Sequence, residues 1–176
     1  RAVVDAYRDR GTDGEERLEI TRHLSVTACP FLLDHCFFRQ PENWPSIIDR
    51  FPVVPLTMLI EMMVDAGQAL VPDLKVVGLE HLRAYKWLVV EPATAVVTQA
   101  KRLDKTRIKV AIKGYTECIL LIAESYPLPP SPSRWPTAAP TDHMVSGDAL
   151  YADRWMFHGP SYQGVRSIDE VHGQGI

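Results

Sequence analysis

The chain has 176 residues, of which 46% are hydrophobic and 23% are charged, and its formal net charge is −3 at pH 7. Such a length and composition belong to one globular domain of ordinary size, or to one and a fraction. The slightly acidic balance and the scattered Lys and Arg residues exclude the basic surface that nucleic acid requires.

The three cysteines, Cys29, Cys36 and Cys118, are odd in number and not closely paired, which argues against a disulfide framework. No Cys or His spacing suggests zinc, so we expect no metal. The longest apolar runs are too short to cross a bilayer, and residues 1–17 lack a signal-peptide core. We therefore expect a cytoplasmic protein. The start without Met and the ending at Ile176 suggest a piece of a longer polypeptide.

The N-terminal third contains two segments without clear periodicity and one predicted strand. Residues 1–17 are polar and are expected to form a lead-in segment or a short helix. Residues 18–28 alternate between apolar and polar side chains, which predicts a strand that ends before Pro30. Residues 39–52 contain three prolines and predict a loop with one helical turn at 45–50.

A long helix is predicted from Pro55 to about Leu70. Proline suits the first position of a helix, and Pro72 prevents its continuation. Apolar residues occupy nearly every side of this segment, which is typical of a buried helix. We therefore expect it to be covered on most sides.

Strand-like runs follow this helix. They comprise residues 75–79, 87–90, 93–102, 107–115 and 117–125, and the turn at 103–106 predicts a hairpin. An antiparallel sheet that curls around one central helix satisfies the pattern, so the expected fold class is α+β.

A second unit is expected to begin at about residue 145. Residues 127–144 form a Pro-rich linker, with six prolines between Pro127 and Pro140. The segments that follow predict a short helix at 148–155, a loop at 157–164 and a strand that begins at 165.

His35 is the strongest catalytic candidate, because it follows the apolar run 30–33 and precedes the buried helix. An imidazole beside a buried helix can have a shifted pKa and act as a base near neutral pH. Asp34 is expected to be an exposed neighbour that faces away from His35, since adjacent strand residues point to opposite faces. For the same reason a nucleophilic pair of His35 and Cys36 is not expected.

Two motifs resemble those of polyketide synthase dehydratase domains, which have a double hotdog fold. Leu32-Leu33-Asp34-His35 followed by Val53-Val54-Pro55 is similar to the motifs of the family's first half. Tyr151 to Gln163, with Gly159-Pro160 and Tyr162-Gln163 in register, is similar to the start of its second half. The resemblance covers about residues 18–176. It implies a complete first hotdog at 18–126, the linker, and the beginning of a second hotdog at 145–176.

Three departures from the family pattern stand near the expected site. Residues Gln40–Phe51 look like an insertion at its mouth, and Arg39 and Leu56 occupy positions where the family has glycine. The family's catalytic acid lies on the central helix of the second hotdog, so it is expected beyond Ile176.

The resemblance implies removal of water from a 3-hydroxyacyl thioester carried by the phosphopantetheine arm of an acyl carrier protein. His35 would be the base, and no intrinsic cofactor is expected. The substrate-binding residues implied or suggested near it are Pro55, Leu56, His158, Gly159, Pro160, Tyr162 and Gln163. Further partners would be neighbouring synthase domains, and exposed sheet edges favour a homodimer.

Alternatives remain open from the sequence. Glu61 lies six residues after Pro55, where single-hotdog dehydratases carry an acid, and is a second candidate for that role. A product-template-like cyclase would share the fold and a His/Asp pair but close a ring by aldol chemistry. A non-catalytic structural or acyl-binding hotdog is the third interpretation.

Overall fold

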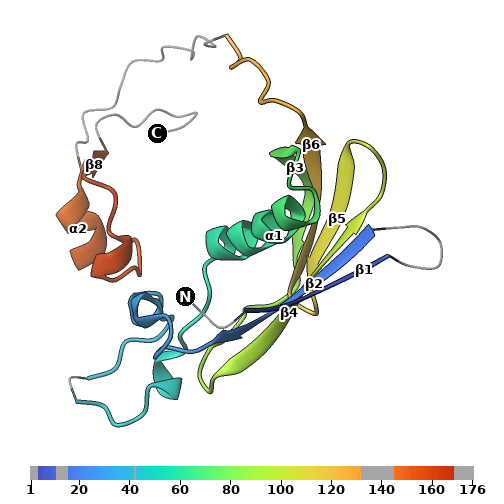
Figure 1. The fold of residues 1–176 in the computed structure, drawn as a ribbon. Coiled ribbons are helices and arrows are strands. Elements are labelled where there is room, and N and C mark those ends of the chain that lie inside the picture. Colours follow the sequence, from blue (N-terminus) through green and yellow to red (C-terminus); the bar gives the residue numbers. More distant parts are fainter. Residues whose placement is uncertain (1–3, 11–15, 42, 132–144, 169–176) are drawn as a thin grey trace.

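The computed structural model describes residues 4–10, 16–41, 43–131 and 145–168. Its main body is a six-stranded antiparallel sheet in the order β1-β2-β4-β5-β6-β3, with α1 (Leu56–Leu70) lying along its concave face (Figure 1). The strands are β1 (Val4–Arg10), β2 (Glu16–Leu24), β3 (Lys75–Ala84), β4 (Thr94–Arg102), β5 (Arg107–Ile112) and β6 (Thr116–Ala123). This is the expected α+β arrangement of a sheet around one helix.

The core lies between α1 and the sheet. The strict alternation of buried and half-buried side chains along β6 shows which face of the sheet is turned toward it. Cys118, Leu120 and Ile122 point from β6 toward the helix and are buried. A Cβ atom on Gly67 would overlap the Cδ1 atom of Leu120, so any other residue at this position of α1 would require the Leu120 side chain to move. The close approach of helix and strand at this point sets how deeply α1 sits in the sheet.

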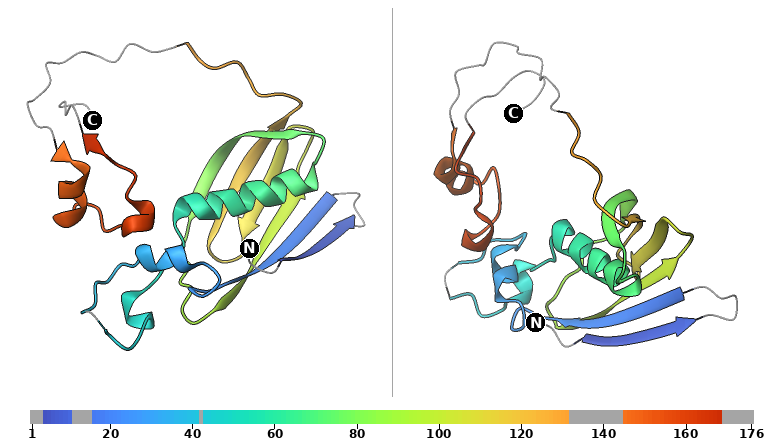
Figure 2. Two further views of the ribbon diagram at one scale, coloured as in Figure 1. Left: turned by 60° about the vertical axis from the view of Figure 1, so that its left-hand side comes forward. Right: turned by 45° about the horizontal axis from the view of Figure 1, so that its top comes forward.

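The helix is buried on one side only, which corrects the expectation of burial on nearly every side. Its buried residues include Met63 and Ala66, both with no exposed surface. A stripe on the opposite side is exposed and comprises Leu56, Thr57, Glu61, Asp65 and Ala69. Figure 2 shows that the sheet covers α1 from one side and leaves the other side open.

Several element boundaries differ from those predicted. Residues 4–10 are not part of a helix or a lead-in but form edge strand β1, which pairs along its length with β2. The strand predicted at 18–28 is β2 and runs from Glu16 to Leu24. Residues 87–90 form a loop with one bridge between Val53 and Val89, whereas β3 extends to Ala84.

Other predictions are confirmed. The helix begins within one residue of Pro55 and ends at Leu70. The hairpin at 103–106 joins β4 to β5, and Arg102 pairs with Ile108. The loop at 39–52 contains a single short turn of 3-10 helix, η2 (Ile48–Arg50).

The C-terminal described segment comprises β7 (Val145–Ser146), α2 (Gly147–Ala152), η3 (Pro160–Tyr162) and β8 (Ser167–Ile168). These elements lie apart from the sheet, on the side of η1 (Pro30–Asp34) (Figure 1, Figure 2). The helix predicted at 148–155 is the shorter α2. Residues 132–144 of the predicted linker at 127–144, and the strand continuation at 169–171, fall outside the described residues. Among the described helices, none combines the length and apolar character that spanning a membrane requires.

Candidate active site

His35 lies at the end of the 3-10 helix η1. The sequence had suggested that it lies in a strand, which is wrong. Its backbone N–H donates to the carbonyl of Leu32, which closes the last turn of the 3-10 helix. Its carbonyl accepts from the N–H of Val53 at 3.1 Å. The turn therefore connects the His35 backbone directly to the segment that leads into α1.

The ring of His35 has a defined tautomer. Its Nδ1 atom lies 2.9 Å from the carbonyl oxygen of Val53. A carbonyl oxygen only accepts, so Nδ1 carries the hydrogen, and in the neutral ring the lone pair is on Nε2. The bond to Val53 thus leaves Nε2 as the basic atom.

Burial lowers the pKa of His35 below its ordinary value. The hydrogen bond to Val53 opposes this effect, and the neighbouring His158 adds to it. The residue is only 5% exposed. Since desolvation disfavours the charged imidazolium, the ring is neutral and able to accept a proton at neutral pH.

Three rings from the C-terminal segment surround His35. Ring centroids lie 5.0 Å away for Phe157, 5.3 Å for His158 and 5.4 Å for Tyr162. His158 also stacks on Phe157, with 4.5 Å between centroids and 17° between planes. The turn that carries His35 and the C-terminal described segment therefore build this site together.

His158 has a buried nitrogen without a partner. Its Nδ1 atom makes no hydrogen bond to any described residue, although it is shielded from solvent. A buried polar atom left unpaired costs roughly 1–3 kcal/mol. In a ring next to His35, such an atom is available to a substrate oxygen.

The N-terminus of α1 lies at the edge of an apolar groove. Pro55 precedes the first turn, and the N–H groups of Leu56 and Thr57 have no acceptor within the helix. An apolar groove of about 460 Å³ begins here and is lined by Val54, Leu56, Leu59, Ala84, Tyr85, Lys86 and Trp87. The positive N-terminal end of the α1 dipole can bind a carbonyl oxygen, and the apolar groove beside it can bind the hydrocarbon chain attached to that carbonyl.

Aromatic contacts connect this groove to His35. Trp87 meets the edge of Phe37 at 4.6 Å, and Phe37 contacts Phe157 at 5.6 Å. Phe51 stacks on Phe37 at 6.0 Å. Phe51 thus belongs to the same aromatic cluster as the rings around His35.

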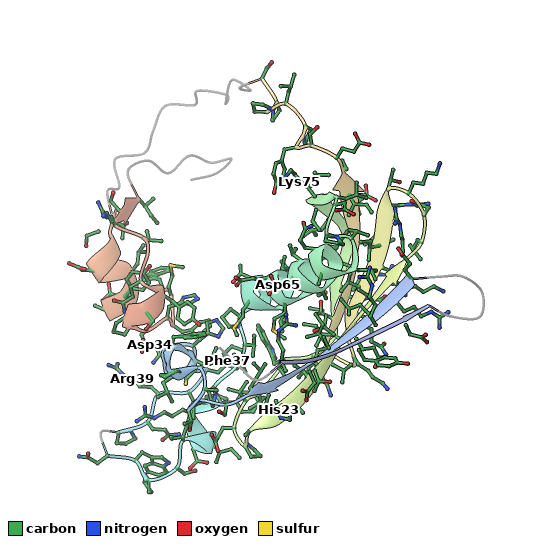
Figure 3. The ribbon with its side chains drawn as sticks, viewed as in Figure 1. His23, Asp34, Phe37, Arg39, Asp65 and Lys75 are labelled. Atoms are coloured by element: carbon green, nitrogen blue, oxygen red, sulfur yellow. The ribbon has the colours of Figure 1, made fainter. Side chains whose placement is uncertain are left out.

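The structure corrects the expectation for Asp34. The residue is half-buried, and its carboxylate accepts from the backbone N–H and the hydroxyl group of Ser161. Figure 3 shows Asp34 and Phe37 between the C-terminal segment and the start of α1, whereas His23 and Lys75 lie elsewhere on the sheet. Because η1 is not a strand, the rule of alternating faces did not apply to Asp34 and His35.

The remaining predicted site residues differ in their positions. Glu61 is exposed on α1. The rings that enclose His35 come instead from Phe157, His158 and Tyr162. Gln163 is exposed and donates to the carbonyl of His158 at 3.1 Å, so it supports the backbone of the loop. Pro160 is exposed and begins η3, and Gly159 packs directly against Asp34.

Cys36 is not arranged as a nucleophile. Burial raises the pKa of its thiol above the ordinary value. The Sγ atom lies 3.2 Å from the carbonyl oxygen of Leu33, to which it can donate its hydrogen. This agrees with the rejection of a Cys-His pair. Among the described residues, no group of three His, Cys, Asp or Glu side chains is arranged to hold a metal ion.

Four residues at this site were not predicted from the sequence: Phe37, Val53, Trp87 and Phe157. Val53 acts through its backbone carbonyl, which leaves no signal in residue type. Phe157 precedes the Gly-Pro motif directly, and this position was the one available clue to its role.

No protein-family model matches this sequence, and no curated protein sequence matches it. Solved structures do match it. The dehydratase domain of a mycocerosic acid synthase-like polyketide synthase aligns with a TM-score of 0.61 and 17% identity, over 93% of this chain and 55% of that one. The dehydratase domain of the terminal module of the rifamycin synthase aligns with a TM-score of 0.56 and 20% identity, over 88% and 56%.

A bifunctional dehydratase-cyclase domain from ambruticin biosynthesis aligns with a TM-score of 0.51 and 20% identity, over 96% of this chain and 57% of that one. The chain thus spans about half the length of the solved structures that it matches. At these identities the likeness is one of fold. With its antiparallel sheet around one helix, the chain has the hotdog fold of these dehydratase domains.

Proposed function

We propose that this chain supplies the base and much of the acyl site of a dehydratase in a polyketide or related fatty-acid megasynthase. The reaction is the removal of water from a (3R)-3-hydroxyacyl thioester, which gives the trans-2-enoyl thioester. The observation that supports it most is the state of His35, a buried ring whose Nδ1 is bonded to Val53 and whose Nε2 is left basic.

Each step of the elimination has a candidate group. Nε2 of His35 takes the proton from C2, the electron pair forms the double bond between C2 and C3, and the C3–O bond breaks. The hydroxyl group leaves as water after it receives a proton from a carboxylic acid. As the family resemblance implies, we expect this acid beyond Ile176, on the central helix of a second hotdog.

Two further groups act on substrate oxygens in this proposal. The free N–H groups of Leu56 and Thr57 at the start of α1 polarise the thioester carbonyl, which makes the C2 proton more acidic. His158 offers its unpartnered Nδ1 to the hydroxyl group that leaves. The apolar groove beside Leu56 accommodates the acyl chain.

The substrate in this proposal is delivered on the phosphopantetheine arm of an acyl carrier protein. Neighbouring synthase domains are the other partners, and the reaction needs no metal or redox cofactor because it is an acid–base elimination. A homodimer and a cytoplasmic location belong to the same proposal. The structural likeness to dehydratase domains of polyketide synthases supports this context.

A cyclase is the second candidate, and it is favoured by one observation. A dehydratase-cyclase domain is among the solved structures with this fold. A base at His35 would equally remove a proton from a poly-β-keto chain and start an aldol ring closure.

The test is an assay in the longest polypeptide that contains this chain, with a 3-hydroxyacyl-pantetheine substrate. We expect the product to have lost one water, and His35→Ala to lower the rate about 10²–10⁴-fold. His23→Ala, which removes an exposed histidine from β2, is the matched control and retains activity. A cyclase instead converts only a poly-β-keto substrate. A lack of product from both substrates would indicate a non-catalytic hotdog.

A further inference from the structure

We infer that Asp34 is a positioning residue that fastens the loop at 157–162 over the ring of His35. Its effect on turnover rests on the proposed function, whereas the fastening itself does not. Asp34 is adjacent to His35 in the sequence, and the loop lies 127 residues away along the chain.

Three hydrogen bonds join Asp34 to the loop. Its carboxylate accepts from the N–H of Ser161 at 2.9 Å and from the hydroxyl group of Ser161 at 2.5 Å. Its backbone carbonyl accepts from the N–H of Gly159 at 2.7 Å. Hydrogen bonds to an ionised carboxylate are roughly twice as strong as neutral ones. One residue therefore anchors the loop at two backbone positions.

Gly159 fits against Asp34 without space for a side chain. A Cβ atom at this position would lie 2.5 Å from Oδ1 and 2.8 Å from both Cβ and Cγ of Asp34. The backbone φ of Gly159 is −80°, which other residues also adopt, so the requirement for glycine is one of space. The absence of a side chain is what lets the loop approach closely enough for its N–H groups to reach Asp34.

The anchored positions lie between the rings that enclose His35. Phe157 and His158 immediately precede Gly159, and Tyr162 immediately follows Ser161. All three rings have centroids within 5.5 Å of the His35 ring. Loss of the anchor would let these rings move away from His35 and admit water. Asp34 acts through these residues and does not itself take part in the proton transfer.

The first experiment measures the loop and the reaction separately in the longest polypeptide that contains this chain. Hydrogen exchange is followed at the amides of Gly159 and Ser161, and turnover is followed with the 3-hydroxyacyl-pantetheine substrate. We expect Asp34→Ala to speed exchange at Ser161 at least about tenfold and to lower kcat about 100-fold, since misplacement by about 1 Å has that effect. Asp34→Asn, which keeps one acceptor oxygen, is expected to have a smaller effect on both.

Asp65→Asn is the matched control, because Asp65 is a largely exposed carboxylate on α1. It should leave both measurements unchanged. Unchanged exchange at Ser161 in Asp34→Ala would overturn the inference, as would faster exchange throughout β4, β5 and β6, which indicates general destabilisation. Should the wild-type protein form no enoyl product, the proposed function fails, while exchange at Ser161 still decides whether Asp34 fastens the loop.

A double-mutant cycle gives a second test. Gly159→Ala alone should free the loop, because the new methyl group overlaps Asp34. Asp34→Gly removes all three atoms that the methyl group would meet. In that background we expect Gly159→Ala to change exchange at Ser161 less than twofold. Additive effects of the two substitutions would overturn the inference.

Discussion

The imidazole rings of His35 and His158 lie 5.3 Å apart and are tilted by 53°. One comes from the turn before α1, and the other comes from the loop that precedes η3. His158 adds to the burial that lowers the pKa of His35. The protonation state of His35 and the hydrogen bonding of His158 can each be tested by substitution.

The lowered pKa of His35 predicts a specific dependence of stability on pH. The ring takes up a proton in the unfolded chain at a pKa of about 6.5, and in the folded protein only at a lower pH. Above about pH 6.5 both states are neutral, and there is no penalty. As the pH falls through that value, the unfolded chain binds the proton first, so the folded state loses stability until the lower folded pKa is reached.

Urea unfolding of the wild type and of His35→Gln at about pH 7.5 and about pH 5.5 measures this effect. The glutamine amide can still donate to the carbonyl of Val53 but does not titrate. We expect the free energy of unfolding to fall more between these pH values in the wild type than in the variant. Equal losses in both proteins would contradict the prediction.

His158→Phe should separate stability from activity. The phenyl ring can still stack on Phe157, while the buried Nδ1 atom without a partner is removed. We expect the free energy of unfolding to rise by about 1 kcal/mol, and the rate with the 3-hydroxyacyl substrate to fall at least about tenfold. Full activity in this variant would show that His158 only fills space. Thermal unfolding and initial rates provide the two measurements.

Glu61→Gln tests the alternative acid on α1. Glu61 is exposed on α1, so we expect the rate to stay within about twofold of the wild type. Asp65→Asn, one turn further along the same exposed face, is the control. A loss of more than about tenfold in Glu61→Gln alone would favour a single-hotdog mechanism, with the acid on this helix.

Gly67→Ala should destabilise the protein although alanine favours helix. Propensity alone would stabilise the helix by about 1 kcal/mol, but the methyl group would overlap the fully buried Leu120. We expect a net loss of about 1–3 kcal/mol from overpacking. Ala69→Gly, on the exposed side of α1, measures the propensity contribution by itself.

Leu120→Ala completes this test of the core. Alone it should cost about 2–5 kcal/mol, because it leaves a cavity beneath α1. Combined with Gly67→Ala, the loss should be smaller than the sum of the single losses, since the two changes compensate in volume. A strictly additive result from chemical denaturation would mean that Gly67 and Leu120 are not in contact.

Local patterns in the sequence predicted the parts of the fold that depend on local interactions. Proline at both ends and dense apolar residues predicted α1 within one residue of its observed start. Alternation and a four-residue turn predicted the β4–β5 hairpin. The polar segment that forms β1 was missed because its structure depends on pairing with β2 and not on its own side chains.

The sequence by itself determined that an apolar helix would pack against an antiparallel sheet and that His35 would lie beside the start of that helix. It overstated how many sides of the helix are covered. It could not determine that Nδ1 of His35 is bonded to the carbonyl of Val53, because a backbone acceptor is independent of residue type. Nor could it place Phe157 and Ser161, which meet His35 and Asp34 only after more than a hundred residues of intervening chain have folded. Periodicity is a property of neighbouring residues, whereas the basicity and enclosure of His35 arise from contacts that only the tertiary structure brings together.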